Sequence, residues 1–290
     1  MNQWQEYVGR SRERSECVSP TDLLRLAALL DYPLLRRAAD AALPWPENTV
    51  PCYAHWLQGN PPARQSELGP DGHPQLGSFL PPVALPRRMW AGSRVQVLGD
   101  YRAGQPLLHR ETITSIEHKS GRSGELVFIT LQHDYLSDND LVLQEQQDIV
   151  YRDAAQAAQP TPEAIPEAQL LTLYDYNWCC TVHPDPTLLF RYSAATFNGH
   201  RIHYDRAYAT GVEGYPGLVV HGPLTATLLI DLYQRHNPGR RPTAFDFRGL
   251  RPLFDTQPFY LMGKPCAGGA ELWAVNCAGE RAMQMNLSTC

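Results

Sequence analysis

The chain has 290 residues, of which 43% are hydrophobic and 19% are charged, and its formal net charge is −5. This composition excludes an intrinsically disordered chain, and the negative charge argues against a nucleic-acid partner. The length favours two domains over one. No window reaches the roughly 18 apolar residues that a membrane span needs. Residues 1–16 also lack the apolar core of a signal peptide, so we expect a cytoplasmic protein without a membrane partner.

The seven cysteines are irregularly spaced, and no CxxC pair occurs among them. Paired cysteines at short spacing are typical of zinc sites and redox dithiols. The sequence therefore predicts reduced thiols and no metal site.

The first half begins with a segment that we predict to be helical over residues 1–43, because Ser19-Pro20-Thr21-Asp22 is typical of a helix start. Residues 44–86 are rich in Pro and Gly but carry aromatic residues, which indicates a packed loop with a short helix near 52–57. Alternating segments then predict antiparallel strands around 94–98, 112–118, 125–133 and 141–151. Asp138-Asn139-Asp140 is a hairpin turn between the last two strands.

Residues 154–169 are small, polar and interrupted by Pro, as in a linker. We place the domain boundary there, between an N-terminal domain at 1–153 and a C-terminal domain at 170–290.

The second half starts with strand-like segments at 170–180 and 188–193, followed by a polar loop and an apolar helix over residues 222–236. Further strands are predicted around 243–250, 257–262, 270–277 and 282–287. Both halves thus place helix before antiparallel strands, which is the order expected of a duplicated α+β unit.

The apolar helix carries no formally charged residue between Gly217 and Leu229 apart from a possible charge on His221. A helix that is apolar on all sides is buried, and it can be a core helix and nothing more. At its start, however, Gly222 precedes Pro223, and the backbone N–H groups of a first helical turn have no partner within the helix. A carbonyl placed there would be polarised by the Gly222 N–H and the helix dipole.

The loop before this helix gathers Asn198, His200, His203 and Asp205. A His in such a loop is suited to moving a proton near neutral pH. This combination resembles the MaoC-like (R)-specific enoyl-CoA hydratases, whose motif runs Asp-x-Asn-Pro-(aliphatic)-His. His203 falls on the catalytic His of that motif, whereas Asn198, His200 and Arg201 replace its Asp, Asn and Pro.

Segments of the first half extend the resemblance, which covers about residues 50–290; they are 68–73, 79–82, 85–92, 121–124 and 147–151. They are similar to the branch that includes itaconyl-CoA and mesaconyl-C4-CoA hydratases and mitochondrial 3-hydroxyacyl-thioester dehydratases. The resemblance implies an α+β, double-hotdog fold, with two antiparallel sheets each wrapped around a central helix and the first half degenerate.

The resemblance also implies a hydro-lyase that adds water to an enoyl-CoA, with itaconyl-CoA or mesaconyl-C4-CoA as substrate and a role in itaconate degradation. His203 would be the base, Gly222 would stabilise the thioester oxygen, and either Asn198 would hold the water or another acid such as Asp205 would assist. The residues expected to bind substrate are Arg201, Arg87, Arg88, Arg248 and His221. No cofactor is expected, because CoA enters as part of the acyl-CoA substrate, and a homodimer is possible.

Three alternatives stay open at this point. The first is a dehydratase of longer 3-hydroxyacyl thioesters, which would have an apolar acyl pocket where a dicarboxylate enzyme has a charged one. The second is a hotdog thioesterase, and the third is a non-catalytic module that binds acyl-CoA.

Overall fold

The computed structural model describes residues 4–33, 44–45, 49–121, 124–154 and 160–290. Parts of the predicted first helix and of the predicted linker, at 34–43 and 155–159, lie outside the described residues, as do residues 122–123 of the 121–124 segment.

The alternating segments of the first half form long antiparallel strands, as predicted. These are β2 (Arg87–Val97), β3 (Leu107–Gly121), β4 (Gly124–Ser137) and β5 (Asp140–Arg152). Asp138 and Asn139 connect β4 to β5 with φ angles of 49° and 74°. Asp and Asn tolerate this left-handed conformation better than other side chains do, and tight hairpins require it.

The second half supplies five further strands and most of the helices. Its strands are β6 (Trp178–Val182), β7 (Pro242–Gly249), β8 (Phe259–Cys266), β9 (Gly269–Val275) and β10 (Arg281–Thr289). Its helices are α2 (Glu167–Leu171), α3 (Pro186–Ala195), α4 (Arg206–Gly211) and α5 (Gly222–His236).

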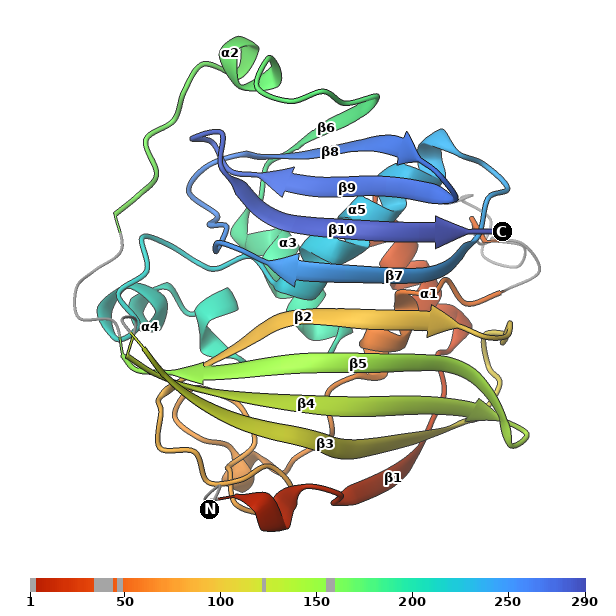
Figure 1. Ribbon diagram of the computed structural model, residues 1–290, viewed down its shortest axis with the longest axis vertical. Coiled ribbons are helices and arrows are strands. Elements are labelled where there is room, and N and C mark those ends of the chain that lie inside the picture. The colour runs from red at the N-terminus through yellow and green to blue at the C-terminus, as the bar shows by residue number, and fades with distance from the viewer. Residues whose placement is uncertain (1–3, 34–43, 46–48, 122–123, 155–159) are drawn as a thin grey trace.

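Together with β1 (Ser11–Glu16) of the first half, these strands of the described residues join one antiparallel sheet in the order β1-β3-β4-β5-β2-β7-β10-β9-β8-β6 (Figure 1). The two halves meet where β2 pairs with β7, with Gly92 opposite Arg248. A Cβ atom at Gly92 would lie 2.3 Å from the carbonyl oxygen of Phe247. Only glycine therefore allows the two strands to approach this closely.

Helix α5 has the bounds that the apolar pattern predicts, and it packs against strands of both halves, β2 and β8 among them. Leu224, Leu229 and Ile230 are fully buried. They share one core with α1 (Pro20–Leu29) of the first half. Ser19 caps α1 in a capping box with Asp22, which confirms the predicted helix start.

The prediction of helix over residues 1–43 is wrong at β1 (Ser11–Glu16), a strand that pairs with β3 at one end of the sheet. Its sequence, SRERSE, contains no apolar residue. The residues that point inward are charged and form ion pairs in the structure, so no hydrophobic alternation marks the strand.

Two strand predictions in the second half also need correction. Residues 188–193 belong to α3, which Asp185 caps by accepting a hydrogen bond from the Leu188 N–H, with Pro186 in the first turn. Residues 170–180 divide between the end of α2 and the start of β6. A short apolar run does not distinguish strand from helix, whereas the Asp-Pro start does. Within the described ranges, no helix is long and apolar enough to cross a membrane.

Candidate active site

His203 ends the short 3-10 helix η5 (Arg201–His203), and its side chain is buried in the wall of a cavity. Its Nδ1 lies 2.7 Å from the carbonyl oxygen of Val219. Because a carbonyl only accepts, Nδ1 carries the hydrogen and Nε2 keeps its lone pair. Burial lowers the pKa of His203 to about 4. The imidazole is therefore neutral at physiological pH and able to take a proton.

His221 holds the His203 ring from one side. The two rings stack with their centroids 3.6 Å apart and their planes 19° from parallel. His221 Nε2 lies 2.9 Å from Ser193 Oγ on α3, and its Nδ1 is buried without a hydrogen-bond partner. Burial and the neighbouring His203 hold the pKa of His221 well below its usual value. His221 is thus a neutral side chain that supports the His203 ring.

The residue after His221 begins α5, so that the start of a buried helix faces the same cavity as His203. Gly222 and Pro223 both line the cavity. The N–H groups of a first helical turn have no acceptor within the helix, and the helix dipole adds partial positive charge there. An oxygen that gains negative charge beside Gly222 would therefore be stabilised.

Asn198 lines the cavity, and its side-chain Oδ1 accepts a hydrogen bond from the backbone N–H of His200. Its Nδ2 group is left for a water or a substrate. Asp205 has a different position: it caps α4 through the Tyr208 N–H and pairs with Arg201 at 2.7 Å. Asp205 is not among the cavity-lining residues, so the structure does not bring it to His203.

A loop of the first half, residues 69–73, contacts the polar loop of the second half. The Asp71 carbonyl accepts from the Arg201 N–H at 2.9 Å. Gly72 has a φ of 88°, and a Cβ atom there would lie 1.9 Å from the Gly199 carbonyl oxygen. This close approach places the His73 ring 4.2 Å from the His200 ring, centroid to centroid.

Asp71, His73 and His200 offer ligand atoms within 4.8 Å of one another, a set that divalent metals accept. Both Asp71 oxygens are already occupied by His73: one accepts from the backbone N–H and the other lies 2.8 Å from Nδ1. The positive charge of Arg88 is also near enough to lower the pKa of His73 and of His200, after the larger effect of burial. The positive charge of Arg88 opposes a cation at this position.

The structure separates the predicted arginines. Arg88, Arg201 and Arg248 line the cavity, whereas Arg87 is buried elsewhere, with its Nε 3.0 Å from Oε2 of Glu213. Arg201 is held by Asp205 and by the carbonyl oxygen of Pro70. Arg87 thus supports the fold and has no access to a ligand in the cavity.

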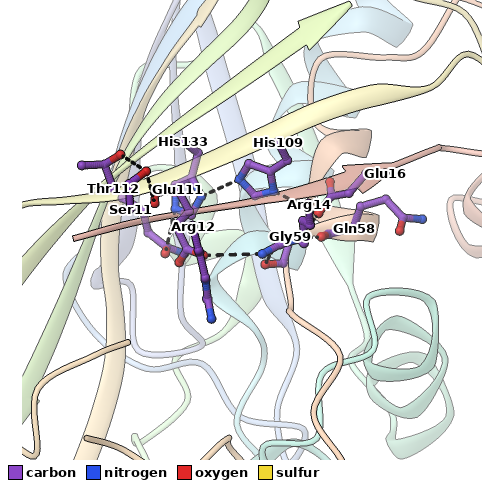
Figure 2. A network of polar contacts seen from close by, with 11 residues as sticks. Ser11, Arg12, Arg14, Glu16, Gln58, Gly59, His109, Glu111, Thr112 and His133 are labelled. Atoms are coloured by element: carbon purple, nitrogen blue, oxygen red, sulfur yellow. Dashed lines mark hydrogen bonds and ion pairs between the residues drawn. The ribbon is translucent and has the colours of Figure 1, made fainter. Parts of the chain in front are cut away.

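The cavity has a volume of about 1280 Å³ and extends into the first half, where it meets a network of charged side chains. Figure 2 shows this network: Glu16 contacts His109, and His109 Nε2 lies 2.9 Å from His133 Nδ1. Arg12 pairs with Glu111 beside them. Arg12, Glu111 and His133 line the cavity, so this part of its wall is polar.

Sequence reasoning assigned no role to Asp71 or His73, although the segment that holds them was among those that support the family resemblance. It also missed Ser193, which lies in a segment predicted as strand. An Asp and a His two residues apart in a Gly-rich loop were the available signal for the first pair.

Comparisons with known proteins are consistent with this geometry. The chain is 43% identical over 281 residues to the mesaconyl-C(4)-CoA hydratase of Chloroflexus aurantiacus, covering 97% of this chain and 95% of that protein. It is 28% identical over 235 residues to the mitochondrial hydroxyacyl-thioester dehydratase type 2 of Schizosaccharomyces pombe, covering 70% and 74% of the two chains.

Solved structures show the same fold. HtdX of Mycobacterium tuberculosis is 17% identical, with a TM-score of 0.68, over 97% of this chain and all of that one. A double-hotdog protein of the same organism is 13% identical, with a TM-score of 0.58, over 97% of this chain and 96% of the other. The prediction of a double hotdog is thereby confirmed.

The family model for hydroxyacyl-thioester dehydratase type 2 matches residues 53–255, which include the His203 loop and the whole of α5. The chain therefore belongs to the hydroxyacyl-thioester dehydratase type 2 family.

Proposed function

We propose that this protein is a hydro-lyase that adds water to the double bond of mesaconyl-C4-CoA and gives citramalyl-CoA. The observation that carries the proposal is the position of a neutral, hydrogen-bonded His203 beside the start of the buried helix α5. The 43% identity to a mesaconyl-C(4)-CoA hydratase over nearly the whole chain supports this substrate.

In the proposed reaction, His203 Nε2 takes a proton from water as the water oxygen forms a bond to Cβ. The electron pair of the double bond moves through Cα onto the thioester oxygen, which the Gly222 N–H stabilises. The imidazolium then returns its proton to Cα, so that one water is added and no charge is left on the enzyme. Asn198 is placed to hold the water through Nδ2.

The polar wall of the cavity in the first half supports a short, charged acyl group. Buried charged or polar groups such as Glu111, His133 and Glu145 line it. These groups bond to protein partners, as Glu111 does to Arg12 and Glu145 to His55, and they present polar atoms, not apolar surface, to a long fatty acyl chain. Dehydration of longer 3-hydroxyacyl thioesters is therefore the second candidate.

We also propose that the protein hydrates itaconyl-CoA and that it is located in the cytoplasm.

The test is a steady-state assay of the purified protein with mesaconyl-C4-CoA, itaconyl-CoA and crotonyl-CoA, with products followed by mass. We expect the highest kcat/KM with mesaconyl-C4-CoA and a loss of about 10²- to 10⁴-fold in a His203→Asn variant. A higher kcat/KM with crotonyl-CoA or longer enoyl-CoA chains would favour the fatty-acyl dehydratase. Release of free CoA would indicate a thioesterase. Binding without turnover would indicate the non-catalytic module.

A further inference from the structure

The cavity contains one arginine that differs from its neighbours. The arginines that line the cavity are Arg12, Arg88, Arg152, Arg201, Arg248 and Arg251. Arg12, Arg201 and Arg251 pair with Glu111, Asp205 and Glu280, and Arg152 contacts Tyr215. Arg248 is exposed at the end of β7. Arg88 is partly buried and has no ion pair or hydrogen bond to any residue that the structure describes.

The position of Arg88 follows from strand alternation on β2. Successive side chains of a strand point to opposite faces. Arg87 turns to Glu213 and is absent from the cavity wall, whereas Arg88 lines the cavity. The charge of Arg88 is one of the causes that lower the pKa values of His73 and His200, so the three side chains lie close together.

His200 is the second unpartnered polar group at this place. Its side chain is buried, and neither ring nitrogen has a hydrogen-bond partner within the described part of the chain. A neutral imidazole always carries one N–H that can donate. The His200 ring meets the His203 ring edge-on, with 5.3 Å between centroids. A free N–H donor thus lies beside the proposed base, and an unpaired guanidinium lies near that donor.

The nearby acid, Asp71, forms no ion pair with Arg88 in the part of the chain that the structure describes, although, against the effect of burial, His73 and, to a smaller extent, the charge of Arg88 lower the pKa of Asp71. Asp71 directs both carboxylate oxygens at His73. That hydrogen bond fixes the hydrogen of His73 on Nδ1, and it directs the Asp71 carboxylate toward His73 and not toward Arg88. A guanidinium without a carboxylate partner is suited to a planar anion, which it can bind through two parallel N–H···O bonds.

We infer that Arg88 and His200 form a subsite that binds a free carboxylate on the acyl group, adjacent to the carbon that His203 hydrates. This inference rests on the proposed function and deepens it. In mesaconyl-C4-CoA the carboxylate is attached to Cβ, the carbon that water attacks. A group that binds this carboxylate next to His203 therefore also sets the position of Cβ. The substrate class is then short enoyl thioesters that carry a carboxylate at Cβ.

The experiment compares binding of succinyl-CoA and butyryl-CoA, which have four-carbon acyl chains ending in a carboxylate and a methyl group. Neither carries a double bond, so binding is measured without hydration, by calorimetry with freshly prepared thioesters. We expect the wild-type protein to prefer succinyl-CoA. Arg88→Gln is expected to lose that preference by about 10- to 100-fold, with butyryl-CoA binding unchanged. Unchanged butyryl-CoA binding also shows that the variant is folded.

Arg248→Gln is the matched control, because it removes another cavity arginine that lies at an exposed position. We expect it to change the affinities for both thioesters by the same factor. The inference is overturned if the wild-type protein does not prefer succinyl-CoA, or if Arg88→Gln weakens both thioesters equally. A preference that depends on Arg88 in a protein that does not hydrate mesaconyl-C4-CoA would retain the subsite and reject the proposed function.

Discussion

At the scale of single residues, the state of His203 is set by two neighbours with different effects. The Val219 carbonyl determines which nitrogen carries the hydrogen, and the stacked His221 ring limits the movement of the imidazole. Burial has a third effect, because it lowers the pKa of His203. Together they make His203 a neutral, oriented imidazole in the cavity wall, which is what the proposed base requires.

The low pKa of His203 predicts the pH dependence of the reaction. Because the base is neutral above its pKa of about 4, we expect kcat/KM to stay level from pH 7 to about pH 5 and to fall below that. An ordinary histidine would give a midpoint near pH 6.5. The measurement is a kcat/KM profile, with circular dichroism at each pH as the control for unfolding. A midpoint between pH 6 and 7 would contradict the assignment of His203 as the base.

The lowered pKa of His203 also makes the folded protein less stable as the pH falls. In the unfolded chain His203 takes up a proton below about pH 6.5, whereas in the folded protein it does so only near its pKa of about 4. The unfolded state therefore binds more protons between these values, and the stability contributed by His203 is lost as the pH falls through that window.

Gly222 allows a test of the helix start without loss of the fold. A Cβ atom at this position would have Trp90 O as its nearest neighbour, at an ordinary 3.9 Å. Gly222→Ala should therefore fold with an unchanged Tm. Its methyl group would displace the thioester, so we expect kcat/KM to fall by about 10- to 100-fold. Enzyme assays and thermal unfolding measure both. An unchanged kcat/KM would show that the thioester does not approach Gly222.

At the scale of elements, a prediction succeeded where the element is defined by its own residues and failed where the element depends on partners that are distant in the sequence. The bounds of α5 were predictable because the helix is apolar on all sides and begins with Gly-Pro. The strand β1 was not, because its inward-facing side chains are charged, and Arg12 and Glu16 pair with Glu111 and His109, more than ninety residues away in the sequence. His203 could be placed by motif and spacing. The approach of His73 to His200 could not, since it depends on contact between loops of different halves.

The network that joins β1 to the sheet predicts a large effect of one substitution. His109→Leu removes the contacts of His109 with Glu16 and His133 and leaves a buried carboxylate without this partner. We expect the free energy of unfolding to fall by about 3 kcal/mol. His118→Leu is the control, because His118 pairs with Glu125 at an exposed position and should change stability by less than about 1 kcal/mol. Urea denaturation measures both variants, and equal effects would contradict the prediction.

At the scale of the whole molecule, the two halves contact each other at three places. They share the β2–β7 pairing, a common core around α1 and α5, and the loop contact at Gly72. The candidate site depends on these contacts, because Arg88 and His73 come from the first half, whereas His203 and Gly222 come from the second.

Gly92 is the point at which this joining can be tested. Gly92→Val would push a side chain into the Phe247 carbonyl on β7. We expect a loss of about 1–3 kcal/mol in stability, or more if the strands separate. Gly211→Ala, at a helical glycine with no atom near its Cβ position, should leave stability within about 0.5 kcal/mol of the parent. Both variants are measured by urea denaturation. Comparable losses of stability would show that the close approach of β2 and β7 does not require glycine at position 92.

The pairing of β2 with β7 has a further consequence, because both strands belong to one polypeptide. Two separate hotdog subunits would meet only above their dissociation constant, and a site shared between them would be lost on dilution. Here the halves are tethered at a high effective concentration. Each half is also free to change its own residues. Arg88 on one side and His203 on the other can therefore have different tasks, without a duplicate of either across a symmetry axis.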